Sequence, residues 1–152
     1  MDATRIVLAD DHYLIREGLR SILEERSDLH IVGEASDGLQ LLLLLDQWKP
    51  HLAILDISMP NLRGIETARQ IKMKYPEMKI LILTMHRERE YLYEAISAGA
   101  EGYLLKDDSE KELLSAIDTI LRGEGFLSPI LRAALEEKHK MLPEFLKFFM
   151  DS

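Results

Sequence analysis

Short apolar runs alternate with amphipathic helical patterns five times along this sequence, and this alternation restricts its fold more than any other feature. The apolar runs lie at residues 5–9, 29–33, 52–56, 79–84 and 101–106. After each of them, apolar residues recur three and four positions apart, as on one face of a helix. Strands that alternate with helices through short connections form a parallel sheet with helices on both faces. Because crossovers are right-handed, we expect a flavodoxin-like, doubly wound α/β fold, with five strands ordered 2-1-3-4-5 and five flanking helices.

The pattern changes after the fifth helical segment. Ser128-Pro129 is typical of a helix start, with an N-cap residue followed by proline at the first helical position. Further along, apolar residues recur at helical spacing at Leu142, Phe145, Leu146 and Phe149. We therefore expect one main domain over residues 1–125 and a C-terminal helical tail, or a truncated linker, over residues 126–152.

Composition limits the classes of function that are open to the chain. The absence of cysteine excludes disulfides and thiolate metal sites. The net charge of −8, from 27 acidic and 19 basic residues, argues against direct nucleic-acid binding by this chain, since such binding needs Lys and Arg to neutralise phosphates. No run approaches the roughly 20 apolar residues of a membrane span, and no signal peptide is evident. We expect a cytoplasmic protein without membrane contact.

Polar side chains end four of the five predicted strands. They are Asp10 and Asp11 after the first strand, Asp56 on the third, Thr84 on the fourth and Lys106 on the fifth. In the order 2-1-3-4-5 these four strands are neighbours, and the carboxyl ends of parallel strands share one edge of the sheet. The five side chains are therefore expected to converge.

Three carboxylates at one edge repel one another unless a cation lies among them. Oxygen ligands without histidine or cysteine suit Mg²⁺, which takes one or two carboxylates and keeps waters for an incoming phosphate. An aspartate held in this way is also able to accept a phosphoryl group. Lys106 would offset the charge on that group, and Thr84 would hydrogen-bond one of its oxygens. The residues alone thus predict a Mg²⁺-assisted aspartyl-phosphate site.

This set of residues resembles the site of a response-regulator receiver domain of two-component signalling. Asp56 stands in an Asp-x-x-Met-Pro-x-x-x-Gly64 segment, and Lys106 follows Gly102-Tyr103 with the expected spacing. Other segments are similar to the LuxR/NarL-type subfamily of transcriptional regulators: Asp10-Asp11-His12, Arg16-Glu-Gly-Leu19, Gly33-Glu-Ala-Ser-Asp-Gly38, Leu83-Thr-Met-His86 and Gly102-Tyr-Leu-Leu-Lys-Asp107. The resemblance covers about residues 3–128.

The resemblance implies roles for the acidic residues. Asp56 accepts the phosphoryl group from a sensor histidine kinase. Asp11 and Asp56 bind Mg²⁺ directly, together with the backbone carbonyl of Ser58. Asp10 acts on the ion through a bound water.

It also implies roles for residues around the phosphoryl group. Thr84 and Lys106 bind the group, and Tyr103 is the aromatic switch partner of Thr84. Ser58 and His86 occupy variable positions that tune dephosphorylation. The chain would promote only its own phosphorylation and dephosphorylation, and would not be an enzyme acting on other substrates.

The output implied by the resemblance is a change of surface at the fourth helix, fifth strand and fifth helix. That change would control dimerisation, through helices or the apolar tail, or binding to an output partner. The subfamily binds DNA through a helix-turn-helix domain, which does not fit before Ser152. The sequence leaves two accounts open: a fragment of a transcription regulator, or a single-domain regulator that acts by protein contact.

Two other classes of function remain. A Mg²⁺-dependent phosphatase could turn over an aspartyl phosphate on external substrates, but haloacid-dehalogenase-like enzymes place a second acid two residues after the nucleophile. Position 58 is serine in this chain, and no cap insertion is evident. The third class is an inert interaction domain, against which the intact acidic set and Lys106 argue.

Overall fold

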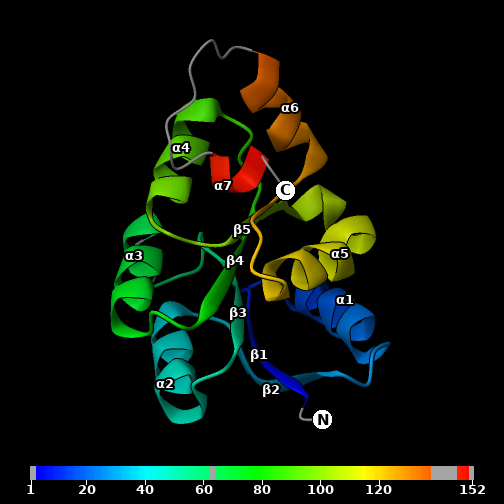
Figure 1. Ribbon diagram of the computed structural model, residues 1–152. Helices are drawn as coiled ribbons and strands as arrows, with labels where there is room; N and C mark the ends of the chain where they lie inside the picture. The colour runs from blue at the N-terminus through cyan, green and yellow to red at the C-terminus, as the bar shows by residue number, and fades with distance from the viewer. Residues whose placement is uncertain (1–2, 62–63, 138–146, 151–152) are drawn as a thin grey trace.

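A parallel sheet forms the centre of the molecule, with helices on both of its faces (Figure 1). The computed structural model describes residues 3–61, 64–137 and 147–150. The strands are β1 (Thr4–Ala9), β2 (Leu29–Ala35), β3 (Leu52–Asp56), β4 (Lys79–Thr84), β5 (Gly102–Leu105) and β6 (Phe126–Leu127). The helices are α1 (Tyr13–Glu24), α2 (Gly38–Trp48), α3 (Ile65–Lys74), α4 (Arg89–Ser97), α5 (Ser109–Leu121), α6 (Pro129–Glu137) and α7 (Lys147–Met150).

The strand order is β2-β1-β3-β4-β5-β6, which confirms the predicted fold class and adds one strand at the edge. The prediction of five strands was wrong because β6 has only two residues, too few to show a period. The fully buried Ser128, which directly follows β6, connects this strand to β5. The Ser128 hydroxyl oxygen accepts a hydrogen bond from the Leu105 backbone N–H at 2.8 Å, and the Ser128 N–H donates to the Tyr103 carbonyl at 3.0 Å.

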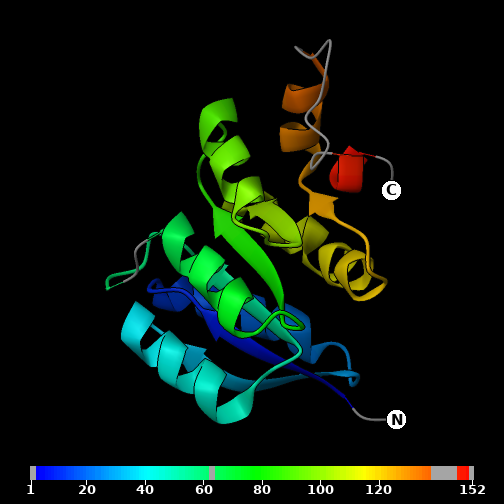
Figure 2. The same cartoon turned by 60° about the vertical axis from the view of Figure 1, so that its left-hand side comes forward.

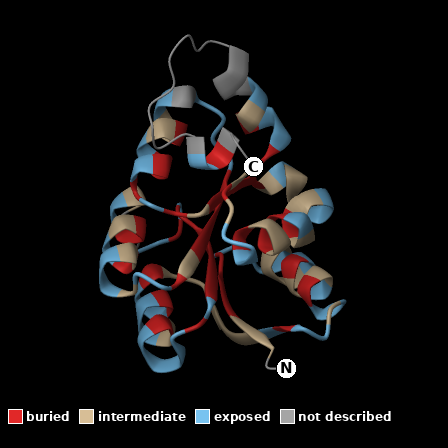
Figure 3. Cartoon of the chain, in the orientation of Figure 1, coloured by how far each residue is buried: buried red, intermediate tan, exposed pale blue. Residues whose placement is uncertain are grey.

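The sheet separates two apolar layers. Alternate residues of the central strands, such as Ile54 and Leu83, pack against α1 and α5 on one face. Their neighbours, such as Leu55 and Ile82, pack against α2, α3 and α4 on the other face. The buried positions in Figure 3 follow the strands and the inward sides of these helices. Because both faces are covered, each central strand is a nearly continuous apolar run, as the sequence predicted.

Helix α2 buries only one side of its leucine-rich segment. Leu41 and Leu45 are fully buried, whereas Trp48, the last residue of the helix, is 40% exposed. The helix ends at Trp48, and Lys49 adopts a left-handed conformation with φ of 42°. Leu43, on the opposite side, is 72% exposed.

The C-terminal helices lie together beside β5 and β6 in both views of the chain (Figures 1 and 2). Helix α6 begins at Pro129, as predicted, and its Leu131 is fully buried. In α7, Phe149 is 2% exposed, and its ring centroid lies 5.9 Å from that of Tyr103. The other predicted apolar positions of the tail lie outside the described residues: Leu142, Phe145 and Leu146. No helix in the described part of the chain is long and apolar enough to cross a membrane.

The contact between β5 and α5 is tight enough to test by substitution. A Cβ atom added at Gly102 would lie 2.7 Å from Ile120 Cδ1 and 2.9 Å from Leu81 Cδ1. Both side chains are fully buried, so Gly102→Ala is expected to lower the free energy of unfolding by about 1–3 kcal/mol, as overpacking does. Urea unfolding monitored by circular dichroism measures this difference.

Gly18→Ala is the matched control, because a Cβ atom there meets nothing within 4 Å. Gly18 lies inside α1, where alanine is the better helix former, so this substitution is expected to stabilise the protein by about 0.5–1 kcal/mol. Equal stability of the two variants would contradict the packing described for β5 and α5.

Candidate functional site

Strand register brings the predicted acidic residues to one edge of the sheet. Ala9 of β1 pairs with Leu55 of β3, so Asp10 lies beside Asp56 at the carboxyl ends of these strands. Asp56 in turn pairs with Leu83, one residue before Thr84. The sheet thus places these side chains at one edge, as the sequence predicted.

Lys106, which directly follows β5, bridges two of the carboxylates. Its Nζ lies 2.8 Å from Asp56 Oδ2 and 3.0 Å from Asp10 Oδ2. Asp10 is fully buried and Asp56 is 1% exposed, while the Lys106 side chain is 5% exposed. Asp11, the fourth member, is exposed at the rim. Two buried carboxylates therefore share one ammonium group.

The hydrogen bonds around Asp56 keep it ionised. Burial by itself raises the pKa of the Asp56 carboxyl, but its interactions with Lys106 and Ser58 together hold that pKa below the usual value. Asp56 Oδ1 accepts hydrogen bonds from the Ser58 hydroxyl at 2.7 Å and from the Ser58 N–H at 2.9 Å. Burial likewise lowers the pKa of Lys106, but attraction to Asp56 and Asp10 outweighs it, and the net shift is upward. The pair is therefore charged at neutral pH.

His12 also lies within the acidic cluster, although its sequence pattern did not predict a place in the site. Its backbone N–H donates to Asp10 Oδ1 at 2.8 Å, and its Nδ1 lies 2.9 Å from the same oxygen. Nδ1 is also 3.2 Å from Asp11 Oδ1 and 3.3 Å from Lys106 Nζ. One ligand atom from each of Asp10, Asp11, His12 and Asp56 falls within 4.8 Å of all the others. The available signal was the position of His12 directly after the aspartate pair.

Thr84 contacts a tyrosine, Tyr91, that the sequence pattern did not single out. Thr84 is 5% exposed, and its hydroxyl oxygen accepts a hydrogen bond from the His86 backbone N–H at 3.0 Å. Burial raises the pKa of the Tyr91 hydroxyl, while a hydrogen bond with Thr84 acts in the opposite direction. The His86 ring stacks on Tyr91 with centroids 4.1 Å apart. Thr84, His86 and Tyr91 thus form one polar group at the start of α4.

Tyr103 points away from the acidic edge toward α4 and the tail. It is 1% exposed, and its hydroxyl donates a hydrogen bond to the Ala95 carbonyl of α4. Its ring contacts Phe149. The predicted role of Tyr103 as switch partner of Thr84, like that of the Ser58 carbonyl as a ligand, stays a prediction.

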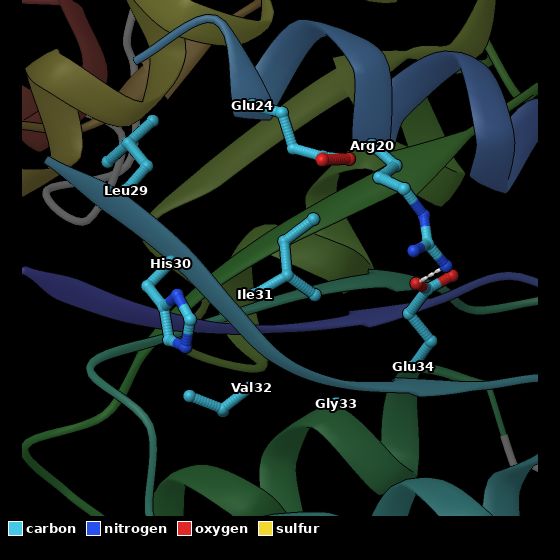
Figure 4. Close-up of a pocket in the computed structure, with 8 residues that line it drawn as sticks. All are labelled: Arg20, Glu24, Leu29, His30, Ile31, Val32, Gly33 and Glu34. Atoms are coloured by element: carbon cyan, nitrogen blue, oxygen red, sulfur yellow. Dashed lines mark hydrogen bonds and ion pairs between the residues drawn. The ribbon is translucent and has the colours of Figure 1, made fainter. Parts of the chain in front are cut away.

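A separate pocket lies between α1 and the edge strand β2 (Figure 4). Arg20 and Glu34 form an ion pair across its mouth. His30, which also lines it, pairs in register with Arg5, near the opposite end of β1 from Asp10. None of the residues lining this pocket belongs to the acidic cluster, so the cluster remains the candidate site.

Comparison of the sequence with known proteins agrees with this geometry. Residues 6–118 match the response regulator receiver domain family. The chain is 42% identical over 134 residues to the transcriptional regulatory protein YxjL of Bacillus subtilis, covering 88% of this chain and 62% of YxjL. It is 37% identical over 132 residues to the oxygen regulatory protein NreC of Staphylococcus carnosus, covering 86% of this chain and 61% of NreC. The chain thus spans about 61–62% of the length of these curated relatives.

Solved structures give the same result. A LuxR-family two-component response regulator from Aurantimonas sp. superimposes with a TM-score of 0.83 at 35% identity, covering 90% of this chain and 97% of that chain. The RcsB response regulator of Salmonella typhimurium gives 0.86 at 29% identity, covering 95% and 73%. Its isolated receiver domain with the phosphomimetic BeF₃⁻ gives 0.81 at 28% identity, covering 87% and 98%. The chain therefore belongs to the response regulator receiver domain family, and its relatives are regulators of the NarL/LuxR type.

Proposed function

We propose that this chain is the phosphorylation-controlled switch of a NarL/LuxR-type regulator, in which Asp56 accepts a phosphoryl group from a sensor histidine kinase. One observation carries the proposal: the Lys106 ammonium bridges the buried carboxylates of Asp56 and Asp10 beside Asp11. A carboxylate that is buried, ionised and held by donors on both oxygens is positioned to act as a nucleophile.

The donor set fits Mg²⁺. Asp10 Oδ2 is a fully buried carboxylate oxygen that shares the Lys106 ammonium, 3.0 Å away, with Asp56. The three carboxylates carry three negative charges, and the Lys106 ammonium neutralises one of them. One divalent cation would neutralise the remaining two. Asp11, Asp56 and the Ser58 carbonyl would hold the ion directly, and Asp10 through a water. A bound ion would supply positive charge to the phosphoryl oxygens.

In the transfer step, a carboxylate oxygen of Asp56 forms a bond to phosphorus as the phosphorus–nitrogen bond of the kinase phosphohistidine breaks. The electron pair of the broken bond stays on the imidazole nitrogen. Lys106, 2.8 Å from Asp56 Oδ2, would offset the charge of the transferred group. The Thr84 hydroxyl would then turn from Tyr91 to a phosphoryl oxygen. This movement would change the surface of α4. The change would reach Tyr103 because the Tyr103 hydroxyl is hydrogen-bonded to Ala95 of α4.

Neighbouring residues would set how long the phosphoryl group lasts. The Ser58 hydroxyl donates a hydrogen bond to one oxygen of Asp56, and the exposed His86 ring stacks on Tyr91. Both residues would then influence the access of a hydrolytic water. The chain would turn over only its own phosphoryl group. Residues 1–125 would form the receiver part, and residues 126–152 a helical tail or linker.

The output would be self-association or contact with another part of the regulator. RcsB has been described as dimers bound to DNA. By analogy, this chain would pair with a second copy, and DNA would be bound by a separate helix-turn-helix domain of the regulator rather than by this acidic chain.

A beryllofluoride phosphoryl mimic tests the proposal. With Mg²⁺ present and beryllofluoride at about 100 times its dissociation constant, binding should raise the free energy of unfolding by about 2.7 kcal/mol. The thermal unfolding midpoint should then rise by about 5–10 °C, and the oligomeric state by light scattering should change. The variant Asp56→Asn should show neither effect. A wild type that responds no more than this variant would contradict the proposal.

A further inference from the structure

We propose that His12 supplies a nitrogen ligand to the divalent cation site, so that first-row transition metal ions bind this chain more tightly, relative to Mg²⁺, than the carboxylates alone would allow. This inference rests on the proposed function, because it takes the acidic cluster to hold a cation. It adds a ligand that lies outside the oxygen set predicted from the sequence.

The position of the His12 ring nitrogen is that of a ligand atom. Nδ1 lies 2.9 Å from Asp10 Oδ1, 3.2 Å from Asp11 Oδ1 and 3.9 Å from Asp56 Oδ2. Adjacent ligands at about 2.1 Å from an octahedral ion are roughly 3 Å apart. The nitrogen therefore has the spacing of an adjacent ligand from Asp11 Oδ1 and lies nearer to the spacing of an opposite ligand from Asp56 Oδ2, the two carboxylates proposed to hold the ion directly.

The backbone that carries the ring is held close to the acidic cluster. His12 is the N-cap residue of α1, with an extended conformation of φ −94° and ψ 107°. Its N–H donates to Asp10 Oδ1, so the turn that carries the histidine is tied to the buried carboxylate. The side chain is 56% exposed, which leaves it free to turn by the small amount that ligation needs.

The chemistry of imidazole gives the expected selectivity. Carboxylate and water oxygens suit Mg²⁺, whereas imidazole nitrogen suits ions such as Zn²⁺ and Ni²⁺, and affinity for such sites rises from Mn²⁺ through Co²⁺ to Ni²⁺. In the alternative reading of these contacts, the ring only hydrogen-bonds to the carboxylates and does not bind the ion. The two readings differ in whether nitrogen is bonded to the metal, and that difference can be measured.

Pulsed electron paramagnetic resonance on the Mn²⁺-loaded, tag-free protein is the direct test. Wild type should show coupling of the manganese electron spin to a ¹⁴N nucleus, and His12→Asn should lose it. His30→Asn is the matched control, since His30 is an exposed histidine near the other end of the sheet, and it should keep the coupling. By calorimetry, His12→Asn should weaken Co²⁺ binding about tenfold or more while changing Mg²⁺ binding less than about threefold.

The outcomes separate this inference from the proposed function. In one outcome, Mn²⁺ binds and Asp11→Asn weakens the binding, but no nitrogen coupling is seen and His12→Asn leaves the ratio of Co²⁺ to Mg²⁺ affinity unchanged. That outcome would overturn the role of His12 and leave the acidic site in place. Wild type that fails to bind Mn²⁺ and Mg²⁺, or that binds them no better than Asp11→Asn, would overturn the acidic site itself.

Discussion

Replacing Lys106 with methionine is expected to lower the free energy of unfolding by about 3–5 kcal/mol in the absence of divalent ions, because it leaves buried charge without a partner. Asp10 and Asp56, which are 0% and 1% exposed, would then face each other without the ammonium between them. Oxygens of the two carboxylates lie within 4.8 Å of each other, and like charges this close favour the protonation of one carboxyl. Mg²⁺ should restore part of the loss, since it supplies the missing positive charge.

Chemical denaturation measures this effect, and Lys111→Met is its control. Lys111 lies exposed on α5, so its replacement should change the free energy of unfolding by less than about 0.5 kcal/mol. Combining Lys106→Met with Asp10→Asn should cost less than the sum of the single changes, because the second change removes one of the orphaned charges. If Lys106→Met were as stable as Lys111→Met, the ammonium bridge would have no structural role.

Asp56→Asn is expected to abolish phosphoryl incorporation from acetyl phosphate, the largest functional effect of any single substitution in this chain. The amide keeps the shape of the side chain and an oxygen that can accept the Ser58 hydrogen bonds. It lacks the negative charge and the second oxygen that the transfer needs. Incorporation should fall to background, while circular dichroism shows a folded protein.

The control for this substitution is Asp107→Asn, one residue beyond Lys106. Asp107 is an exposed carboxylate that pairs with Arg87 at 2.9 Å and takes no part in the acidic cluster. Its replacement should leave incorporation at the wild-type level. Equal incorporation into wild type and Asp56→Asn would exclude Asp56 as the acceptor.

The fold was predictable because it depends on local patterns that repeat. A strand buried on both faces, such as β3, is apolar up to its last residue, Asp56, and the helices between the strands have one apolar face. The order of the strands then follows from the handedness of the crossovers. Once that order is known, the convergence of Asp10, Asp56 and Lys106 follows from strand ends alone, and the structure places them in contact.

Features that depend on single contacts were not predictable in this way. The two residues of β6 carry no periodic signal, and the strand is evident only from its pairing with β5 and from the bonds of Ser128 to that strand. Tyr91 and Tyr103 are equally aromatic in the sequence, and only the packing of α4 places Tyr91 beside Thr84. His12 belongs to a turn, where the direction of a side chain is set by the backbone hydrogen bond to Asp10 rather than by any period.

Locating the phosphoryl group on the wild-type chain tests whether Asp56 is the phosphoryl acceptor. The protein is incubated with acetyl phosphate and Mg²⁺, the acyl phosphate is reduced with borohydride to fix its position, and peptides are sequenced by mass spectrometry. One modified residue is expected, Asp56, at the end of β3. A chain that stays unmodified, or that carries the group on another residue while Asp56 is unchanged, would contradict this expectation.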